Sequence, residues 1–339
     1  AGMSAGAMAA GNTVVYKPAS LTPLAGYELA RCFIDAGLPE GVFNYVTGGG
    51  AEVGEPLAMH PDVDGVAFTG SKEVGLKLYK EVSANYAKPC LTEMGGKNPT
   101  IVTKNADLDK AVEGVARSAF GFSGQKCSAC SRVYVEKPVY DDFISRLAKK
   151  TQELVVGDPQ NRDVFVGPVI DDKAVKRFEQ ALDSATGGNV RAGGKRLTGG
   201  VYENGTYVAP TVVDGLPLDH ELFYNELFLP FVVVGAVDSL DEAIERSNDS
   251  EYGLTAGIFT EDKGEIQRFF DNIEAGVIYA NRKGGSTTGA WPRCQSFCGW
   301  KGSGSTGKGG LGPYSVSQFL REQSRTVVVY DDDEKTVGE

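Results

Sequence analysis

The sequence has few histidines and no excess of positive charge. His60 and His220 are its only imidazoles in 339 residues, so proton transfer would fall to carboxylates, lysines or thiolates. Its 34 Lys and Arg residues are outnumbered by 45 Asp and Glu residues, which gives a net charge of −11. A chain this acidic has no overall field to attract nucleic acid or an anionic membrane, and we expect neither as a partner.

Long apolar runs and a disulfide framework are also missing. No run approaches the roughly 20 apolar residues of a membrane span. The opening AGMSAGAMAAG lacks the basic start and sustained apolar centre of a signal peptide. Six unevenly spaced cysteines are not typical of a secreted disulfide-rich protein. These absences favour a cytoplasmic protein with reduced thiols.

The hydrophobic residues that are present, 41% of the chain, alternate between strand and helix spacing. Strands are predicted at 13–16, 41–50 and 63–71, helices at 23–39 and 71–86, and the same alternation at 132–154 and 229–248. This alternation predicts an α/β fold of parallel βαβ units. The glycine-rich segment 283–315 has no periodicity and predicts a long functional loop. The apolar TVVVY at 326–330 predicts one more strand before an acidic end.

The stretch FTGSKEVG, residues 68–75, passes from a predicted strand to a predicted helix through Gly70 and Ser71. Free amides and a positive helix terminus at such a turn can bind a phosphate group. The spacing is not the usual dinucleotide fingerprint, and plain Gly-Ser turns are common. Lys17 follows the first predicted strand and could reach the same ligand, or it is an ordinary surface lysine.

The stretch LTEMGGKNP, residues 91–99, places Glu93 between an apolar strand and a Gly-Gly turn. Poor solvation there would raise the pKa of Glu93 toward the range of a useful general base. A capping or salt-bridged glutamate is the alternative.

The stretch SGQKCSACSR, residues 123–132, holds Cys127 and Cys130. A four-thiolate zinc site would need a second pair, and Cys294 and Cys298 have the wrong spacing and a distant place in the chain. A redox pair would normally open a helix, whereas this one follows a helical segment. A single thiolate needs only cationic or amide neighbours, and Lys126 and a glycine turn precede Cys127. We therefore expect Cys127 to be the thiol most reactive toward an electrophile that mimics an aldehyde.

Five motifs, in this order and at these separations, resemble the aldehyde dehydrogenase superfamily: NTVVYKPAS, FTGSKEVG, LTEMGGKNP, GFSGQKCSACSR and NELFLPF. The resemblance implies a partial Rossmann-type cofactor domain and an α/β catalytic domain. It implies that Cys127 attacks the aldehyde, giving a thiohemiacetal and, after hydride transfer to the nicotinamide, a thioester. Glu93 would activate the hydrolytic water. Cys130 would be a packing neighbour, and no metal is implied.

The resemblance also implies a cofactor site. Glu226 and Phe228 of NELFLPF would hold the nicotinamide ribose and ring. Lys17 would contact the adenosine ribose, and Gly50 would line the adenine end. Ser71 and the Gly70 turn would bind the pyrophosphate. Ser20 stands where strictly NAD-preferring relatives have glutamate, so we expect NAD with NADP tolerated.

Within that superfamily, GQKCSACSR and the C-terminal GPYSVSQFLREQSRTV are similar to the Δ1-pyrroline-5-carboxylate dehydrogenases, which oxidise L-glutamate γ-semialdehyde to glutamate in proline catabolism. The amides of Gly310 and Leu311 and the hydroxyl of Ser128 would bind the substrate's α-carboxylate. Phe319 would pack on its aliphatic chain. Another aldehyde or semialdehyde dehydrogenase, or an inactive nucleotide-binding remnant of the fold, stays an alternative.

The sequence departs from the superfamily pattern in several places. Phe297-Cys298-Gly299 stands where Phe-Gly-Gly is usual, and Leu229 where glycine is frequent. Roughly the N-terminal third of a typical member has no counterpart here, including an asparagine that stabilises the oxyanion. We expect residues 1–94 to form part of the NAD-binding domain and residues 95–282 the catalytic domain. Residues 283–339 would supply the substrate loop, the return to the cofactor domain and an oligomerisation strand, so the full-length form would be a homo-oligomer.

Overall fold

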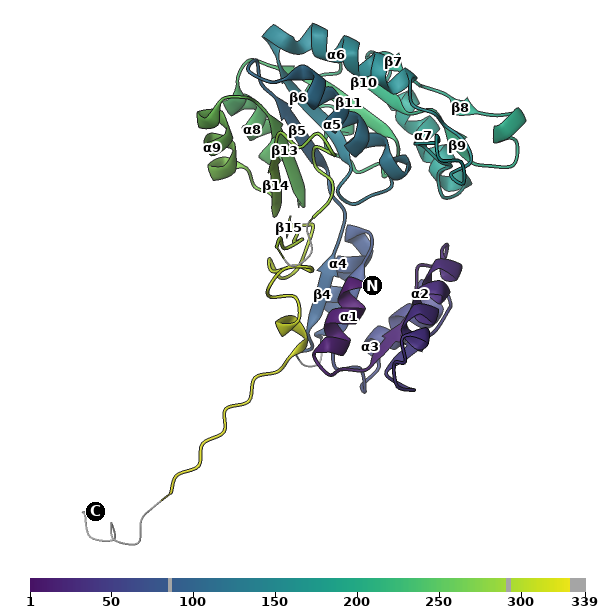
Figure 1. Ribbon diagram of the computed structural model, residues 1–339, viewed down its shortest axis with the longest axis vertical. Coiled ribbons are helices and arrows are strands. Elements are labelled where there is room, and N and C mark those ends of the chain that lie inside the picture. Colours follow the sequence, from purple (N-terminus) through teal and green to yellow (C-terminus); the bar gives the residue numbers. More distant parts are fainter. Residues whose placement is uncertain (85–86, 291–293, 330–339) are drawn as a thin grey trace, which may run out of the picture.

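The computed structural model describes residues 1–84, 87–290 and 294–329. These residues form two lobes, with the last described segment extending away from both (Figure 1). Within the described residues, no helix is long and apolar enough to cross a membrane.

The first lobe contains two pairs of parallel strands and the helices beside them. Strand β1 pairs with β2, and β3 pairs with β4. The strands are β1 (Val14–Tyr16), β2 (Phe43–Tyr45), β3 (Val66–Thr69) and β4 (Cys90–Glu93). The helices are α1 (Gly2–Ala9), α2 (Pro23–Asp35), α3 (Glu55–Met59) and α4 (Lys72–Val82), with a π-helical turn η1 (Gly50–Gly54) before α3. The hydroxyl of Ser71 caps α4 by accepting the amide of Val74.

The second lobe is built on a seven-stranded sheet with the order β14-β13-β5-β6-β11-β10-β7. Neighbouring strands are parallel except at the β7 edge. The strands are β5 (Asn98–Val102), β6 (Cys130–Glu136), β7 (Asn189–Ala192), β10 (Thr211–Asp214), β11 (Phe231–Val237), β13 (Thr255–Phe259) and β14 (Val277–Ala280). All of them lie within residues 95–282, but the division into domains stays a prediction.

Helices cover both faces of this sheet (Figure 1), and each face has its own core. One core contains Phe178, Ile244 and Phe269, and the other Val112 and Phe143. Buried on both faces, the central strands are almost continuously apolar. The helices are α5 (Leu108–Phe120), α6 (Lys137–Gln152), α7 (Asp172–Ser184), α8 (Leu240–Asn248) and α9 (Lys263–Asn272).

Short elements complete the lobe and connect it to the first. These are the strands β8 (Arg196–Leu197), β9 (Tyr207–Val208), β12 (Tyr252–Gly253) and β15 (Trp300–Lys301), and the 3-10 turns η2 (Gly121–Gly124), η3 (Gly200–Tyr202), η4 (Glu221–Phe223) and η5 (Ser317–Phe319). Strand β15 pairs with β12 and lies between the lobes in Figure 1. The chain crosses from β4 to β5 through Gly95 and Gly96.

The predicted C-terminal strand finds no partner strand within the described chain, and as an oligomerisation strand it stays a prediction. Residues 326–329 pair with no described strand, and Val327 is 85% exposed. Apolar β-branched residues favour an extended chain, but a strand needs a partner edge for its backbone groups. Tyr330 and the acidic end lie outside the described residues. The predicted loop at 283–315 is confirmed where described, apart from β15.

Candidate active site

Glu93 is the last residue of β4, at the point where the first lobe meets the second. Burial raises its pKa to about 8, and Oε2 is buried without a hydrogen-bond partner. The predicted rise in pKa is therefore confirmed. The alternative of a salt-bridged or capping glutamate is not supported, because the carboxylate forms neither contact among the described residues.

The turn that carries Cys127 joins η2 to β6 and is held by side chains from other elements. Asn98 donates hydrogen bonds from Nδ2 to the carbonyl oxygens of Cys127 and Ala129, at 2.7 and 2.9 Å. The hydroxyl of Thr287 donates to the carbonyl oxygen of Ser128 at 2.7 Å. Three successive carbonyl groups are thus fixed, so the backbone around Cys127 has little freedom.

The surroundings of Cys127 raise the pKa of its thiol to about 11, a shift opposite to the stabilised thiolate expected from its sequence neighbours. Burial contributes most, followed by the charges of Glu226 and Glu93, while amide hydrogen bonds from Ser128 and Cys127 itself offset only part. The Lys126 amine lies close to Gly121, and although Lys126 and Cys127 interact electrostatically, this interaction is not among the main influences on the thiol pKa.

The exposed cysteines therefore change the expected order of thiol reactivity. All six cysteines are described and none forms a disulfide. Cys32 and Cys294 are exposed, whereas Cys127 is half-buried with a raised pKa. A general alkylating reagent should label those two first, whereas the prediction that Cys127 reacts fastest with an aldehyde-mimicking electrophile stays a prediction.

Glu226 lies against the Gly95–Gly96 turn, next to the same thiol. Its Oε1 accepts the amide of Gly96 at 2.9 Å. A methyl group on Gly95 would come within 2.0 Å of Oε2, so a larger residue there would have to displace the Glu226 carboxylate. Burial raises the pKa of Glu226, although the Gly96 bond and the charges of Lys97 and Arg177 oppose this. The structure brings Glu226, Glu93 and Cys127 together.

Residues 302–305, the GSGS segment, run along β4 and fix its end. The hydroxyl of Ser303 donates to the carbonyl oxygen of Gly95 at 2.7 Å. Ser305 accepts the amide of Thr92 at 2.9 Å and donates to the carbonyl of Cys90 at 2.9 Å. Gly304 forms an isolated antiparallel β-bridge with Glu93 itself. The loop predicted to bind substrate thus also supports the strand that ends in Glu93.

Lys17 and Ser20 meet at the carboxyl ends of β1 and β2, where ligands of parallel sheets bind. Lys17 Nζ donates to the carbonyl oxygens of Pro18 and Gly48 at 2.7 and 3.4 Å, and the Ser20 hydroxyl donates to Gly48 at 3.3 Å. A cavity of about 220 Å³ lies beside Ser20 and Gly48. Gly50, two residues after Gly48 in the sequence, is exposed and is the first residue of η1.

The predicted phosphate turn is only partly available. The amide of Gly70 donates to the carbonyl oxygen of Glu93 at 3.1 Å and is therefore not a free donor, while phosphate binding by the turn as a whole stays a prediction. This bond arises because β3 and β4 are paired to their last residues, Thr69 and Glu93. Ser71 still stands at the N-terminus of α4, where the helix favours an anion.

The residues predicted to bind the substrate are dispersed. The amide of Gly310 donates to the Phe297 carbonyl at 3.0 Å, which contradicts its predicted role as a free donor. Leu311 and Phe319 instead contact α1, where methyl groups on Gly2 and Gly6 would meet their side chains at 3.4 and 3.1 Å. Apolar side chains of a surface loop pack on the nearest apolar face, here this alanine-rich helix. Ser128 is buried beside Cys127.

Two exposed aromatic residues adopt a backbone conformation that bulky residues rarely take. Phe122 and Phe228 have φ of 57° and are 72% and 40% exposed. Ser123 and Gly124 continue the left-handed stretch after Phe122, with φ of 56° and 66°. Such strain persists only where the surroundings fix it. The left-handed stretch from Phe122 to Gly124 lies between α5 and Cys127. Gly124 packs closely against the Leu229 carbonyl group there.

The remaining interpretations of the cysteine pair find no support. Cys130 is 1% exposed on β6, 3.2 Å from the Thr100 hydroxyl, which confirms it as a packing neighbour. Cys298 is buried against Gly276. Within the described ranges, no group of three or more His, Cys, Asp or Glu side chains is arranged to hold a metal ion.

Sequence reasoning missed three residues that shape the site. Asn98 and Ser303 act through hydrogen bonds to backbone atoms far away in the sequence. Lys97 is 2% exposed, and burial and the charge of Arg132 lower its pKa to about 7. A polar Lys-Asn pair directly before the apolar strand PTIV was the available signal, because polar side chains at the start of a buried strand need partners.

Comparison with known proteins places this geometry in a family. The sequence profile of the aldehyde dehydrogenase family matches residues 1–324. The chain is 40% identical over 324 residues to 1-pyrroline-5-carboxylate dehydrogenase 1 of Halalkalibacterium halodurans, covering 94% of this chain and 61% of that protein. It is 41% identical over 279 residues to alpha-ketoglutaric semialdehyde dehydrogenase of Bacillus subtilis, covering 81% and 57%.

Solved structures agree with the sequence matches. Lactaldehyde dehydrogenase from Escherichia coli superposes with a TM-score of 0.88 at 36% identity, covering 94% of this chain and 65% of that one. A point mutant of betaine aldehyde dehydrogenase from Staphylococcus aureus, solved with NAD+, superposes with a TM-score of 0.85 at 30% identity, covering 91% and 61%. This chain spans about three fifths of the length of the curated relatives that it matches. It belongs to the aldehyde dehydrogenase family.

Proposed function

We propose that the protein oxidises L-glutamate γ-semialdehyde to L-glutamate with NAD+, using Cys127 as nucleophile and Glu93 as general base. One observation carries the proposal. A buried carboxylate with one unpaired oxygen and a pKa of about 8 lies close enough to the only half-buried cysteine of the described chain to raise the pKa of that thiol.

The chemistry divides between the two residues. The Cys127 sulfur adds to the aldehyde carbon and the thiol proton passes to the aldehyde oxygen, giving a thiohemiacetal. A bound nicotinamide would supply the hydride acceptor, and loss of hydride from that carbon, with release of the hydroxyl proton to water, leaves a thioester on Cys127. Glu93 then takes a proton from water, the hydroxide oxygen attacks the thioester carbon, and the Cys127 sulfur leaves as the carboxylic acid forms.

Three features support a dinucleotide in the first lobe. The cavity beside Ser20, the capped N-terminus of α4 at Ser71 and the carboxylate of Glu226 offer sites for a ribose, an anion and a second ribose. In this proposal Lys17 contacts the adenosine ribose, Gly50 lines the adenine end and Phe228 supports the nicotinamide. The S. aureus relative binds NAD+, and Ser20 leaves room for NADP because it places no carboxylate near a 2′-phosphate.

The substrate assignment rests on relatives rather than on a shaped pocket. The H. halodurans relative is named for 1-pyrroline-5-carboxylate and the B. subtilis one for alpha-ketoglutaric semialdehyde. Both names describe carboxylated aldehydes, which makes the second substrate our alternative. Ser128 and the amide of Leu311 remain the proposed donors to the substrate carboxylate. A homo-oligomer and a cytoplasmic, reducing location complete the proposal, the latter supported by six unpaired cysteines.

The test compares both aldehydes with NAD+ by following NADH formation with the purified protein. We expect the higher kcat/KM with glutamate γ-semialdehyde and no turnover in Cys127→Ala. Cys130→Ala is the matched control and should retain activity. A higher kcat/KM with alpha-ketoglutaric semialdehyde would favour the alternative, and activity that survives Cys127→Ala would refute the mechanism.

A further inference from the structure

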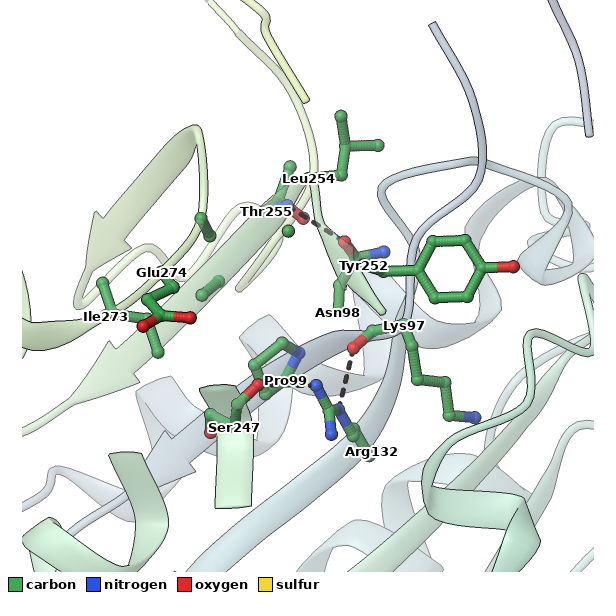
Figure 2. Close-up of a pocket in the computed structure, with 13 residues that line it drawn as sticks. Lys97, Asn98, Pro99, Arg132, Ser247, Tyr252, Leu254, Thr255, Ile273 and Glu274 are labelled. Atoms are coloured by element: carbon green, nitrogen blue, oxygen red, sulfur yellow. Dashed lines mark hydrogen bonds between the residues drawn. The ribbon is translucent and has the colours of Figure 1, made fainter. Parts of the chain in front are cut away.

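Asn98 connects three parts of the chain at the start of β5. It is 1% exposed. Its Nδ2 donates to the carbonyl oxygens of Cys127 and Ala129 at 2.7 and 2.9 Å, and its Oδ1 accepts the amide of Thr255 at 3.0 Å. Figure 2 shows the Thr255 bond, with both residues on the wall of a small cavity. All three polar bonds of this side chain therefore go to backbone atoms.

A second hydrogen bond joins the start of β5 to the segment that contains Cys127, and here the donor comes from that segment. Arg132, from the segment that contains Cys127, donates from Nε to the carbonyl oxygen of Lys97 at 2.8 Å (Figure 2). Its other nitrogen atoms reach the carbonyl oxygens of Arg246 and Ser247 at the end of α8. The segment that follows Glu93 and the segment that contains Cys127 thus hold each other through neighbouring residues.

We propose that Asn98 is a positioning residue that sets the place of the Cys127 turn relative to Glu93. It does so by tying that turn to β5 and β13, two adjacent strands in the rigid seven-stranded sheet. A carboxamide is suited to this because it presents two donors and one acceptor in one plane. The inference rests on the proposed function only where it concerns turnover. Where it concerns the reactivity of the Cys127 thiol, it does not depend on the proposed function.

Asn98→Asp tests the inference with almost no change in volume. The aspartate keeps an acceptor for the Thr255 amide but replaces the two donors with an oxygen that faces two carbonyl oxygens. The charged form should displace the Cys127 turn, and the neutral form can donate to one carbonyl again. The defect should therefore deepen as pH rises, whereas thiolate reactivity in the unchanged protein increases with pH.

Asn281→Asp is the matched control. Asn281 likewise bonds backbone atoms with both ends of its carboxamide, accepting from and donating to Thr260 at 3.0 and 2.7 Å, at the opposite end of β13. All variants carry Cys32→Ser and Cys294→Ser, so that exposed thiols do not consume the reagent. Alkylation of Cys127 by iodoacetamide is followed by peptide mapping at pH 7 and pH 9, and the NADH burst is measured in parallel.

We expect Asn98→Asp to slow both Cys127 alkylation at pH 9 and the NADH burst by about 10- to 100-fold, the scale of a 1 Å misplacement, with less than a threefold change in cofactor KM. Asn98→Ser, which adds no charge, should give alkylation and burst rates between those of Asn98→Asp and the unchanged protein. The serine variant replaces the aspartate variant in the test if the latter does not fold. Equal rates in Asn98→Asp and Asn281→Asp would overturn the inference. A change in alkylation without any aldehyde turnover in the unchanged protein would support it and refute the proposed function.

Discussion

Gly95 and Glu226 are so close that a methyl group on Gly95 would come within 2.0 Å of Glu226 Oε2. The adjacent Gly96 also has no room for a side chain, because a methyl group on it would come within 2.6 Å of the Cys127 carbonyl oxygen. Two successive glycines therefore lie against Glu226 and Cys127. Backbone atoms, rather than a cationic side chain, place the Glu226 carboxylate and the proposed nucleophile relative to each other.

Alanine at each glycine should consequently produce a different defect. Gly95→Ala should displace Glu226 and raise the KM for NAD+ about tenfold, the loss of a hydrogen bond to a charged group. Gly96→Ala should reduce the burst rate instead. Gly284→Ala is the control, since a methyl group there meets nothing within 4 Å. Identical kinetic defects in the two variants would contradict this division.

Glu93→Gln should separate hydride transfer from hydrolysis. The glutamine cannot take a proton from water, so the thioester should form and persist, and steady turnover should fall about 10²- to 10⁴-fold. The first burst of NADH should be retained. Stopped-flow absorbance measures both phases, and Glu179→Gln, an exposed position on α7, is the control. A burst lost together with turnover would rule out Glu93 as the hydrolytic base.

The pH dependence of stability should also report Glu93. Its pKa rises from 4.5 to about 8 on folding, so between these values the folded protein binds more protons than the unfolded chain. The free energy of unfolding must then decrease as pH rises through that window. Glu93→Gln should remove this contribution and flatten Tm between pH 5 and pH 8. A parallel fall in Tm in both proteins would contradict the assignment.

The sequence predicted what depends on local periodicity. The helices at 23–39 and 71–86 and their flanking strands occur close to their expected places, because their apolar spacing is read within a single element. The burial of Glu93 was predictable for the same reason, since an apolar strand precedes it.

The errors share a different cause. The Gly70 amide pairs with the Glu93 carbonyl across two strands, and the Lys126 amine lies close to Gly121. Leu311 packs on a helix more than 300 residues earlier in the chain. Each depends on where distant backbone or side-chain atoms come to lie, and one sequence carries no periodic signal for such contacts.

Glu226→Gln should make the Cys127 thiol more acidic. The charge of Glu226 is the largest contribution after burial to the raised thiol pKa, so its removal should increase the thiolate fraction at a given pH. Alkylation of Cys127 at pH 8 should accelerate severalfold in the Cys32→Ser, Cys294→Ser background. Glu221→Gln, at the exposed first residue of η4, should not change it. Slower or unchanged alkylation would mean that Glu226 acts on the thiol through structure rather than charge.

Ser20 should control the choice between NAD+ and NADP+. Its hydroxyl lies beside the Gly48 carbonyl at the cavity of about 220 Å³, where no carboxylate is among the lining residues. A carboxylate there would repel a 2′-phosphate but can still accept a hydrogen bond from a ribose hydroxyl. Ser20→Glu should therefore lower kcat/KM for NADP+ about tenfold or more, a repulsion of about 1.4 kcal/mol, with NAD+ changing far less. Ser20→Gln has the same length without the charge and should leave the NADP+ to NAD+ ratio near that of the unchanged protein. Equal effects of glutamate and glutamine on that ratio would show that size, not charge, governs the site, and no effect of either would place the ribose elsewhere.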